Sequence, residues 1–245
     1  MYRQVRIETY GQDFGQTSWV TTEESREIPQ MLQLEASSSV LEIGWGSGRY
    51  ALHLAETVGC SIMGLDVNAP GIHNANQLAR MSGVAARARF EQCDASKSLP
   101  FDDETFDAVF ANDVLCHIAG RLNVLCEMFR VLKPGGRMLF SDALVVGGMI
   151  SHEEINTRSW LLLLQSAGEN ERLSEHAGFR EVRATDTTES AASIAKKWHQ
   201  TRKKRRDELV VLEGTSNFEG AASVPFLRSL SDSRASLVEI PVRGG

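Results

Sequence analysis

The residues with the most chemical content are two acids that follow two short apolar stretches, with a run of glycines between them. Residues 40–48 read VLEIGWGSG, and residues 61–66 read SIMGLD. Glycine lets the backbone approach a ligand where a Cβ would clash. An acid such as Asp66, at the end of the second apolar stretch, can accept both hydroxyls of a ribose. The pattern therefore predicts a pocket for a ligand that carries a nucleoside.

The spacing of the glycines separates this pattern from that of the dinucleotide-binding proteins. Gly44, Gly46 and Gly48 form G-x-G-x-G, whereas dinucleotide binders use G-x-G-x-x-G. Glu42 precedes the first glycine by two residues, where it could meet a cationic amine, which a pyrophosphate does not offer. A nicotinamide-dependent oxidoreductase is therefore disfavoured.

Polar residues also follow three further apolar stretches. Asp94 lies near the end of the predicted strand at 90–95, Asn112 near the end of the one at 108–113, and Asp142 ends the one at 137–142. Helices predicted at about 48–58, 69–82 and 120–132 separate these strands, which indicates parallel β-α-β units in a doubly wound sheet. Ligands bind such sheets at the carboxyl ends of the strands. We therefore expect Gly44, Asp66, Asp94 and Asn112 to lie along one edge.

Together with the motifs LPF at 99–101, FD at 106–107 and LKPGG at 132–136, residues 38–142 resemble the class I S-adenosylmethionine-dependent methyltransferases. The details resemble a bacterial subgroup related to the glycine, sarcosine and phosphoethanolamine N-methylators and the ubiquinone C-methylators. The resemblance implies an α/β, Rossmann-like seven-stranded sheet whose last strand is antiparallel, with a helical lid. It also implies methyl transfer by in-line displacement from S-adenosyl-L-methionine to a small-molecule acceptor, which leaves S-adenosyl-L-homocysteine.

The same resemblance assigns roles within the cofactor pocket. The glycines would shape the loop under the methionine and ribose, Asp66 would bind the ribose, and Asp94 the adenine amine. Glu42 would contact either the loop or the amino group, and Trp45, which replaces the family's small residue, would either stack over the loop or pack. Asn112 would use its carbonyl or its side chain. The expected cofactor set is Glu42, Gly44, Trp45, Gly46, Gly48, Asp66, Val67, Asn68, Asp94, Ala95 and Asn112.

For the acceptor, the resemblance points to His117, the candidate catalytic residue. It could remove a proton or orient the acceptor, since an unperturbed histidine titrates near neutrality. It could equally be a histidine hydrogen-bonded at a helix start, and Asp113 has the same two readings. The expected substrate pocket consists of Gln16, Trp19, His117 and Trp160. Packing of a lid on the core is the alternative role for Trp160.

The composition places the chain in an ordinary class. It has 245 residues, of which 42% are hydrophobic and 24% charged, with a net charge of −6. This is typical of a soluble globular protein and disfavours a general nucleic-acid binder. The four cysteines form no C-x-x-C pair, and the apolar run at 160–164 is too short to span a bilayer. We expect a cytoplasmic protein with no membrane or metal partner.

The chain divides into four expected parts. These are an N-terminal helical or lid segment at 1–36, a cofactor-binding α/β core at 37–185, a helical cap insertion at 186–235 and a final core strand at 236–245. The helices expected outside the α/β repeat cover about 23–34, 152–165, 169–177, 188–212 and 219–231. Strands are expected near 179–185 and 237–242.

A basic run at 196–206 leaves a second function open. It could serve an RNA or protein methyltransferase. A solvated helix face is the alternative, because Asp207 and Glu208 follow and the net charge is negative. A cofactor-binding protein without turnover is a third reading, since intact glycine and acid motifs indicate binding and not transfer.

Overall fold

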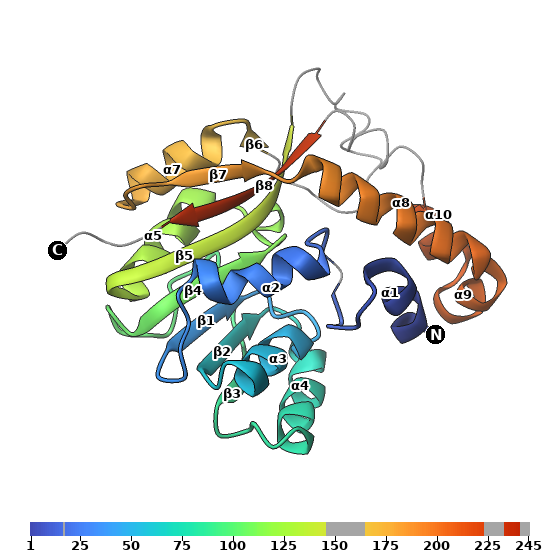
Figure 1. The fold of residues 1–245 in the computed structure, drawn as a ribbon, viewed down its shortest axis with the longest axis horizontal. Coiled ribbons are helices and arrows are strands. Elements are labelled where there is room, and N and C mark those ends of the chain that lie inside the picture. Colours follow the sequence, from blue (N-terminus) through green and yellow to red (C-terminus); the bar gives the residue numbers. More distant parts are fainter. Residues whose placement is uncertain (17, 146–164, 223–232, 241–245) are drawn as a thin grey trace.

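The computed structural model describes residues 1–16, 18–145, 165–222 and 233–240. One twisted sheet runs through the molecule in the order β3-β2-β1-β4-β5-β8-β7, and β6 pairs with β5 (Figure 1). Strands β1 to β5 are parallel, and β8 runs antiparallel to both β5 and β7. The strands are β1 (Ser39–Ile43), β2 (Ser61–Asp66), β3 (Ala88–Gln92), β4 (Phe106–Asn112), β5 (Leu132–Val145), β6 (Gln165–Ser166), β7 (Arg183–Asp186) and β8 (Ser233–Ile240).

Helices cover both faces of this sheet, which confirms the predicted Rossmann-like α/β fold. They are α1 (Tyr2–Tyr10), α2 (Thr22–Met31), α3 (Arg49–Thr57), α4 (Ala69–Met81), the 3₁₀ helix η1 (Leu115–His117), α5 (Arg121–Val131), α7 (Glu169–Ala177), α8 (Thr188–Lys204), α9 (Arg206–Glu213) and α10 (Thr215–Ala222). None of the helices in the described ranges is long and apolar enough to cross a membrane.

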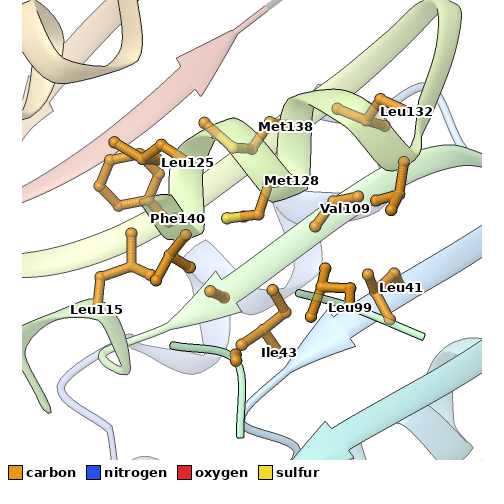
Figure 2. Packing of buried hydrophobic residues seen from close by; sticks show 14 of the residues in the cluster. Leu41, Ile43, Leu99, Val109, Leu115, Leu125, Met128, Leu132, Met138 and Phe140 are labelled. Atoms are coloured by element: carbon orange, nitrogen blue, oxygen red, sulfur yellow. The ribbon is translucent and has the colours of Figure 1, made fainter. Parts of the chain in front are cut away.

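The core consists of two apolar layers, one on each face of the sheet. Helices α5 and α7 cover one layer, where Leu125 and Met128 of α5 pack over Val109 and Phe140 (Figure 2). Helices α2, α3 and α4 cover the other, which includes Val40 of β1. Because alternate residues of a strand face opposite sides, the burial of four consecutive residues of β1 (40–43) places this strand in the middle of the domain.

The helix starts that the sequence predicts are formed by side-chain caps. Thr21 Oγ1 accepts the backbone N–H of Glu24 while the Glu24 carboxylate accepts that of Thr21, which is a capping box at the start of α2. Asn68 caps α4 through the backbone N–H of Gly71. Helix α2 ends at Met31, earlier than the predicted residue 34.

Several predicted boundaries were wrong. Helix α1 was not predicted, and the single helix expected at 188–212 is two helices that meet at Arg205. Strand β5 begins at Leu132, and the sheet register shifts between the pairs Phe106–Leu132 and Ala108–Arg137. The LKPGG motif at 132–136 is therefore an irregularity within β5. The helix expected at 152–165 lies almost entirely outside the described residues, and so does the part of the 219–231 helix after residue 222.

Helices α1, α8, α9 and α10 pack together beside the sheet (Figure 1). Val5 of α1, Leu209 of α9 and Phe218 of α10 form a separate apolar cluster. At its side lies Arg202 of α8, which is buried, forms an ion pair with Glu213 and lies 5.2 Å from the ring of Phe218. The N-terminal helix therefore belongs to the same helical group as the segment after β7.

Candidate functional site

The glycine loop after β1 has left-handed backbone at each of its three glycines, with φ of +76° at Gly44, +54° at Gly46 and +72° at Gly48. A Cβ on Gly44 would lie 2.2 Å from Val114 Cγ2, so this glycine lets β1 pack against the segment after β4. A Cβ on Gly46 would meet no atom within 4 Å. Gly46 therefore has left-handed backbone beside open space, as a loop that approaches a ligand requires.

Asp66, at the end of β2, holds the glycine loop in place. Its Oδ2 accepts the backbone N–H of Gly46 at 3.0 Å, and its Oδ1 accepts that of Asn68 at 2.9 Å. A carboxylate has about four acceptor positions, so two remain for a ligand. Val67, the next residue, is 64% exposed. The predicted pairing of the glycine loop with the acid of the second strand is thus present in the fold.

Asp94 lies beyond the end of β3, next to this group. The backbone N–H of Cys93 donates to the backbone carbonyl of Asp66 at 2.9 Å, which ties the two segments together. Asp94 Oδ1 accepts from the hydroxyl and the backbone N–H of Ser96, and these hydrogen bonds hold the pKa of Asp94 below its ordinary value. Ala95 is buried. The carboxylate of Asp94 remains partly open to solvent.

Two buried oxygens at this edge have no hydrogen-bond partner in the described structure: Oε2 of Glu42 and Oδ1 of Asn112. Burial, and to a lesser extent the nearby Asp66 carboxylate, together raise the pKa of Glu42 to about 8. Buried polar atoms are normally paired, so each unpaired oxygen needs an explanation. A ligand that donates hydrogen bonds would supply one.

Trp45 lies inside the domain. Its ring packs against Phe90 with centroids 5.2 Å apart, and the residue is only 4% exposed. A Cβ on Gly71 would meet the far edge of this ring at 2.8 Å, so α4 packs closely on it. The sequence left open whether Trp45 stacks over the loop or packs in the core. In the structure its side chain packs in the core, and only its backbone belongs to the loop.

Asp113, directly after β4, connects three distant segments. Its Oδ2 accepts the backbone N–H of Trp19 at 2.5 Å, and its Oδ1 accepts the Ser141 hydroxyl at 2.9 Å. Its φ of +52° is rare outside glycine, although aspartate tolerates it better than most residues. Burial raises the pKa of Asp113 to about 6, against the lowering effect of both hydrogen bonds. No local pattern in the sequence indicates the role of Ser141.

A small hollow lies over Asp113 and its partners Trp19 and Ser141. It is lined by Trp19, Val20, Glu24, Asp113, Ser141, Thr187 and Ala191. The walls come from the N-terminal segment, from α2, from the residue after β4, from within β5 and from the start of α8. Residues up to 172 positions apart in the chain therefore meet here. Of the three predicted substrate-pocket residues that the structure describes, only Trp19 lines this hollow.

Gln16 and His117, two of the other predicted pocket residues, do not line the hollow. Gln16 bonds within its own loop, where its side chain accepts from Phe14 N and donates to the Gln12 carbonyl. His117 ends η1 with its backbone N–H on the Val114 carbonyl, and partial burial lowers its pKa while the Asp142 carboxylate opposes this. Trp160 lies outside the described residues.

Close to His117 is a buried polar group that sequence reasoning missed. Asp142 is fully buried at 0% exposure and forms an ion pair with Arg121. The Asn170 amide donates to Asp142 Oδ2 at 3.0 Å, and its oxygen accepts from Arg121. This group joins β5 to the first residues of α5 and α7. A buried, paired arginine gives no local pattern by which the sequence could reveal it.

The N-terminal segment lies along the glycine loop before it reaches Asp113. The Phe14 ring packs against Tyr50 and His53 of α3, with centroids 5.9 and 4.6 Å away. Asp13 is 6% exposed at its side chain, bonds to Arg6 at 2.6 Å and lies 4.0 Å from Arg49, the first residue of α3. Residues 13–16 and 18–19, which we call the strap, thus bridge the glycine loop and the end of β4.

The basic run at 196–206 is not a uniform solvated face. Arg202 is buried against Trp198 and Glu213, and Arg205 forms an ion pair with Glu8 of α1. Lysines 196, 197, 203 and 204 are exposed. Two of its arginines therefore hold helices together, and the structure offers no specific support for a nucleic-acid site there.

The comparisons with known proteins agree with this geometry. Residues 41–140 match the family model described as a methyltransferase domain. Methyltransferase GfsG of Streptomyces halstedii is 31% identical over 170 residues, which cover 67% of this chain and 61% of the relative. Phosphoethanolamine N-methyltransferase 1 of Zea mays is 29% identical over 85% of this chain and 42% of its own. The chain spans between two fifths and three fifths of the length of these relatives.

Two solved structures share the fold. Phosphoethanolamine N-methyltransferase 2 of Haemonchus contortus, in complex with phosphomonomethylethanolamine and S-adenosylhomocysteine, has a TM-score of 0.84 at 20% identity, over 99% of this chain and 57% of its own. The [4+2]-cyclase SpnF has a TM-score of 0.79 at 21% identity, over 91% of this chain and 82% of its own. The match at 41–140 covers the glycine loop, Asp66, Asp94 and Asn112. This chain therefore carries a methyltransferase domain of the class I, S-adenosylmethionine-dependent family.

Proposed function

We propose that this chain binds S-adenosyl-L-methionine at the carboxyl edge of its parallel strands and transfers the methyl group to a small-molecule acceptor. The observation that carries the proposal is the convergence at one edge of the open glycine loop, the Asp66 carboxylate and the unpaired buried oxygens of Glu42 and Asn112. S-adenosyl-L-homocysteine would remain as the product.

The residues present fit such a cofactor group by group. Asp66 keeps two acceptor positions beyond its bonds to the loop, which suits two ribose hydroxyls. The open side of Gly46 leaves room for the sugar and the methionine chain. Asp94 would accept from the adenine amine beside Ala95, with Val67 and Asn68 at the adenine edge. Asn112 and Glu42 would face the methionine end, where the cofactor's amine would donate hydrogen bonds to their unpaired oxygens.

When bound, the cofactor supplies an electrophilic methyl group on a positively charged sulfur, and the protein mainly provides alignment and exclusion of water. Holding two reactants in the productive orientation can contribute about 7–11 kcal/mol to the lowering of a barrier. No nucleophilic triad is required for this reaction. The hollow over Asp113 and Ser141, beside Asn112, is our candidate acceptor site. His117, beside Asp142, would remove a proton from the acceptor or orient it.

We further propose that residues 1–36 and 186–235 form one lid over the core of residues 37–185, whose final strand follows at 236. The strap contacts both the glycine loop and Asp113, and α1 packs on α8 and α9. The cofactor should therefore slow hydrogen exchange in the strap and in α8. Protection restricted to the loops after β1, β2 and β3 would reject the lid, while the cofactor site would stand.

The test of the proposed function begins with binding. Calorimetry should show S-adenosyl-L-methionine and S-adenosyl-L-homocysteine binding in the micromolar range and no binding of NAD. Incubation with a panel of amine, hydroxyl and activated-carbon acceptors should then give S-adenosyl-L-homocysteine and a product 14 mass units heavier (the mass of one CH₂). Cofactor binding with no transfer to any acceptor, in a protein whose hollow is intact, would favour a non-methylating role. Binding of NAD alone would overturn the assignment.

A further inference from the structure

One oxygen of the buried Glu42 carboxyl has no hydrogen-bond partner, and the described residues around it include no donor or cation that could supply one. It is 4% exposed, and on β1 it pairs in register with Gly64 of β2 and Phe110 of β4. Neither neighbour offers a side-chain donor. Within the described residues, its titratable neighbours are Asp66 at the end of β2 and the Tyr50 phenol on α3.

Neither of these neighbours is a cation. Asp66 is an acid, and the Tyr50 hydroxyl already donates to the Ser25 carbonyl at 2.5 Å. A carboxylate that is buried next to another carboxylate, without a cation, carries a large cost in free energy. The carboxyl avoids this cost in one of two ways, by holding a proton or by meeting a positive charge brought from outside.

We propose that Glu42 is a proton-linked specificity residue, which is uncharged in the free protein near neutral pH and releases its proton when a cationic cofactor enters. This inference rests on the proposed function, because it needs a ligand that carries a positive charge to the edge of the glycine loop. S-adenosyl-L-methionine carries its charge on both the sulfonium and the amine, whereas S-adenosyl-L-homocysteine has only the amine. The protein should therefore distinguish the two by charge.

The number of protons released on binding follows from the pKa of Glu42 in the free and in the ligand-bound protein. Burial and the Asp66 charge raise the pKa of Glu42 to about 8 in the free protein. A positive charge within about 4–6 Å lowers the pKa of a carboxyl by about 1–3 units. A fall of about two units gives a release of roughly 0.8 proton per ligand at pH 7 and about 0.1 at pH 5 and pH 9. Proton release should therefore have a maximum near pH 7.

The experiment is calorimetry of S-adenosyl-L-methionine binding in buffers of different ionisation enthalpy, at several pH values between 5 and 9. The slope of the observed enthalpy against the buffer enthalpy counts the protons released. The ligand's amine titrates in the same range, at about 7.7–8.0 for an α-amino group, so it adds its own contribution. The matched control is Glu42→Gln with the same ligand, which keeps that contribution and removes only the one from Glu42. Glu91→Gln, an exposed change on β3, should behave as wild type.

We expect wild type minus Glu42→Gln to show the maximum near pH 7, and a smaller difference with S-adenosyl-L-homocysteine. The same proton count in both proteins would overturn the inference. Infrared difference spectra of the wild type, on adding ligand, should lose a protonated-carboxyl band, and they test the idea even where the variant does not fold. An unchanged band would also overturn it. Failure of the wild type to bind S-adenosyl-L-methionine would sink the proposed function itself, whereas binding without proton release would sink this inference alone.

Discussion

Replacing Asp66 with alanine should weaken cofactor binding strongly while leaving the fold intact. In the structure the carboxylate bonds to the backbone N–H groups of Gly46 and Asn68 and keeps two acceptor positions for ribose hydroxyls. Hydrogen bonds to a charged group contribute about 1.5–3 kcal/mol each. Because water replaces part of what is lost at this partly open site, we expect a total of roughly 2–4 kcal/mol, which is about 30- to 800-fold in Kd.

The assay for Asp66→Ala is calorimetry of S-adenosyl-L-homocysteine binding, together with the free energy of unfolding in urea. Glu91→Ala is the matched control, since it removes a carboxylate from the neighbouring strand with the same change in net charge and lies at an exposed position. The control should bind as wild type. A Kd for Asp66→Ala within about threefold of wild type, in a folded protein, would refute the ribose role. An equal loss in both variants would show instead that net charge dominates.

Three further outcomes follow from the geometry. Gly44→Ala should lower the free energy of unfolding by more than about 2 kcal/mol, because the φ of Gly44 is +76° and the new Cβ would lie 2.2 Å from Val114. Gly46→Ala should lower it by only about 1 kcal/mol and yet reduce cofactor binding. Urea unfolding and calorimetry separate the two effects, and equal stabilities of the two variants would contradict the packing argument. Asp142→Ala should destabilise the protein by about 3–5 kcal/mol, because it breaks a buried ion pair with Arg121. The control Asp103→Ala removes an exposed carboxylate from Arg130 and should have a much smaller effect. Similar decreases in the free energy of unfolding in urea for the two variants would contradict this prediction. The Asp113 carboxyl has a pKa of about 6 in the fold, above its ordinary value near 4, so its contribution to stability is present below about pH 4 and is lost as the pH rises through 6. The free energy of unfolding of the wild type relative to Asp113→Asn should therefore fall by about 2–3 kcal/mol between pH 4 and pH 6. A difference that does not change with pH would show that the pKa of Asp113 is not raised.

The sequence by itself determined the cofactor edge. Gly44, Gly46 and Asp66 lie within 23 residues of one another in a single β-α-β unit, so local signals place them. The apolar strands, the caps at Thr21 and Asn68 and the alternation of strands and helices each depend on short-range preferences. Parallel strands that alternate with helices bring their carboxyl ends to one edge, and the expected convergence of acids there required no further information.

The tertiary structure alone decided the hollow over Asp113, which we propose for the acceptor, and the packing of the helical cap. The Asp113 carboxylate meets the Trp19 backbone across 94 positions and the Ser141 hydroxyl across 28. These contacts leave no periodic pattern, because they depend on how the strap crosses the sheet edge.

The same reason explains the errors in the cap. The basic run was read as one helix with a solvated face, but Arg202 is buried by Phe218 and Glu213 only because the chain breaks at Arg205 and folds back. Distant elements also decided where Trp45 and Gln16 lie: Trp45 packs in the core, which is one of the two roles that the sequence left open, and Gln16 bonds within its own loop. A side chain's type limits what it can contact, but which neighbours it meets is set by elements distant in the chain, whose packing no local preference encodes.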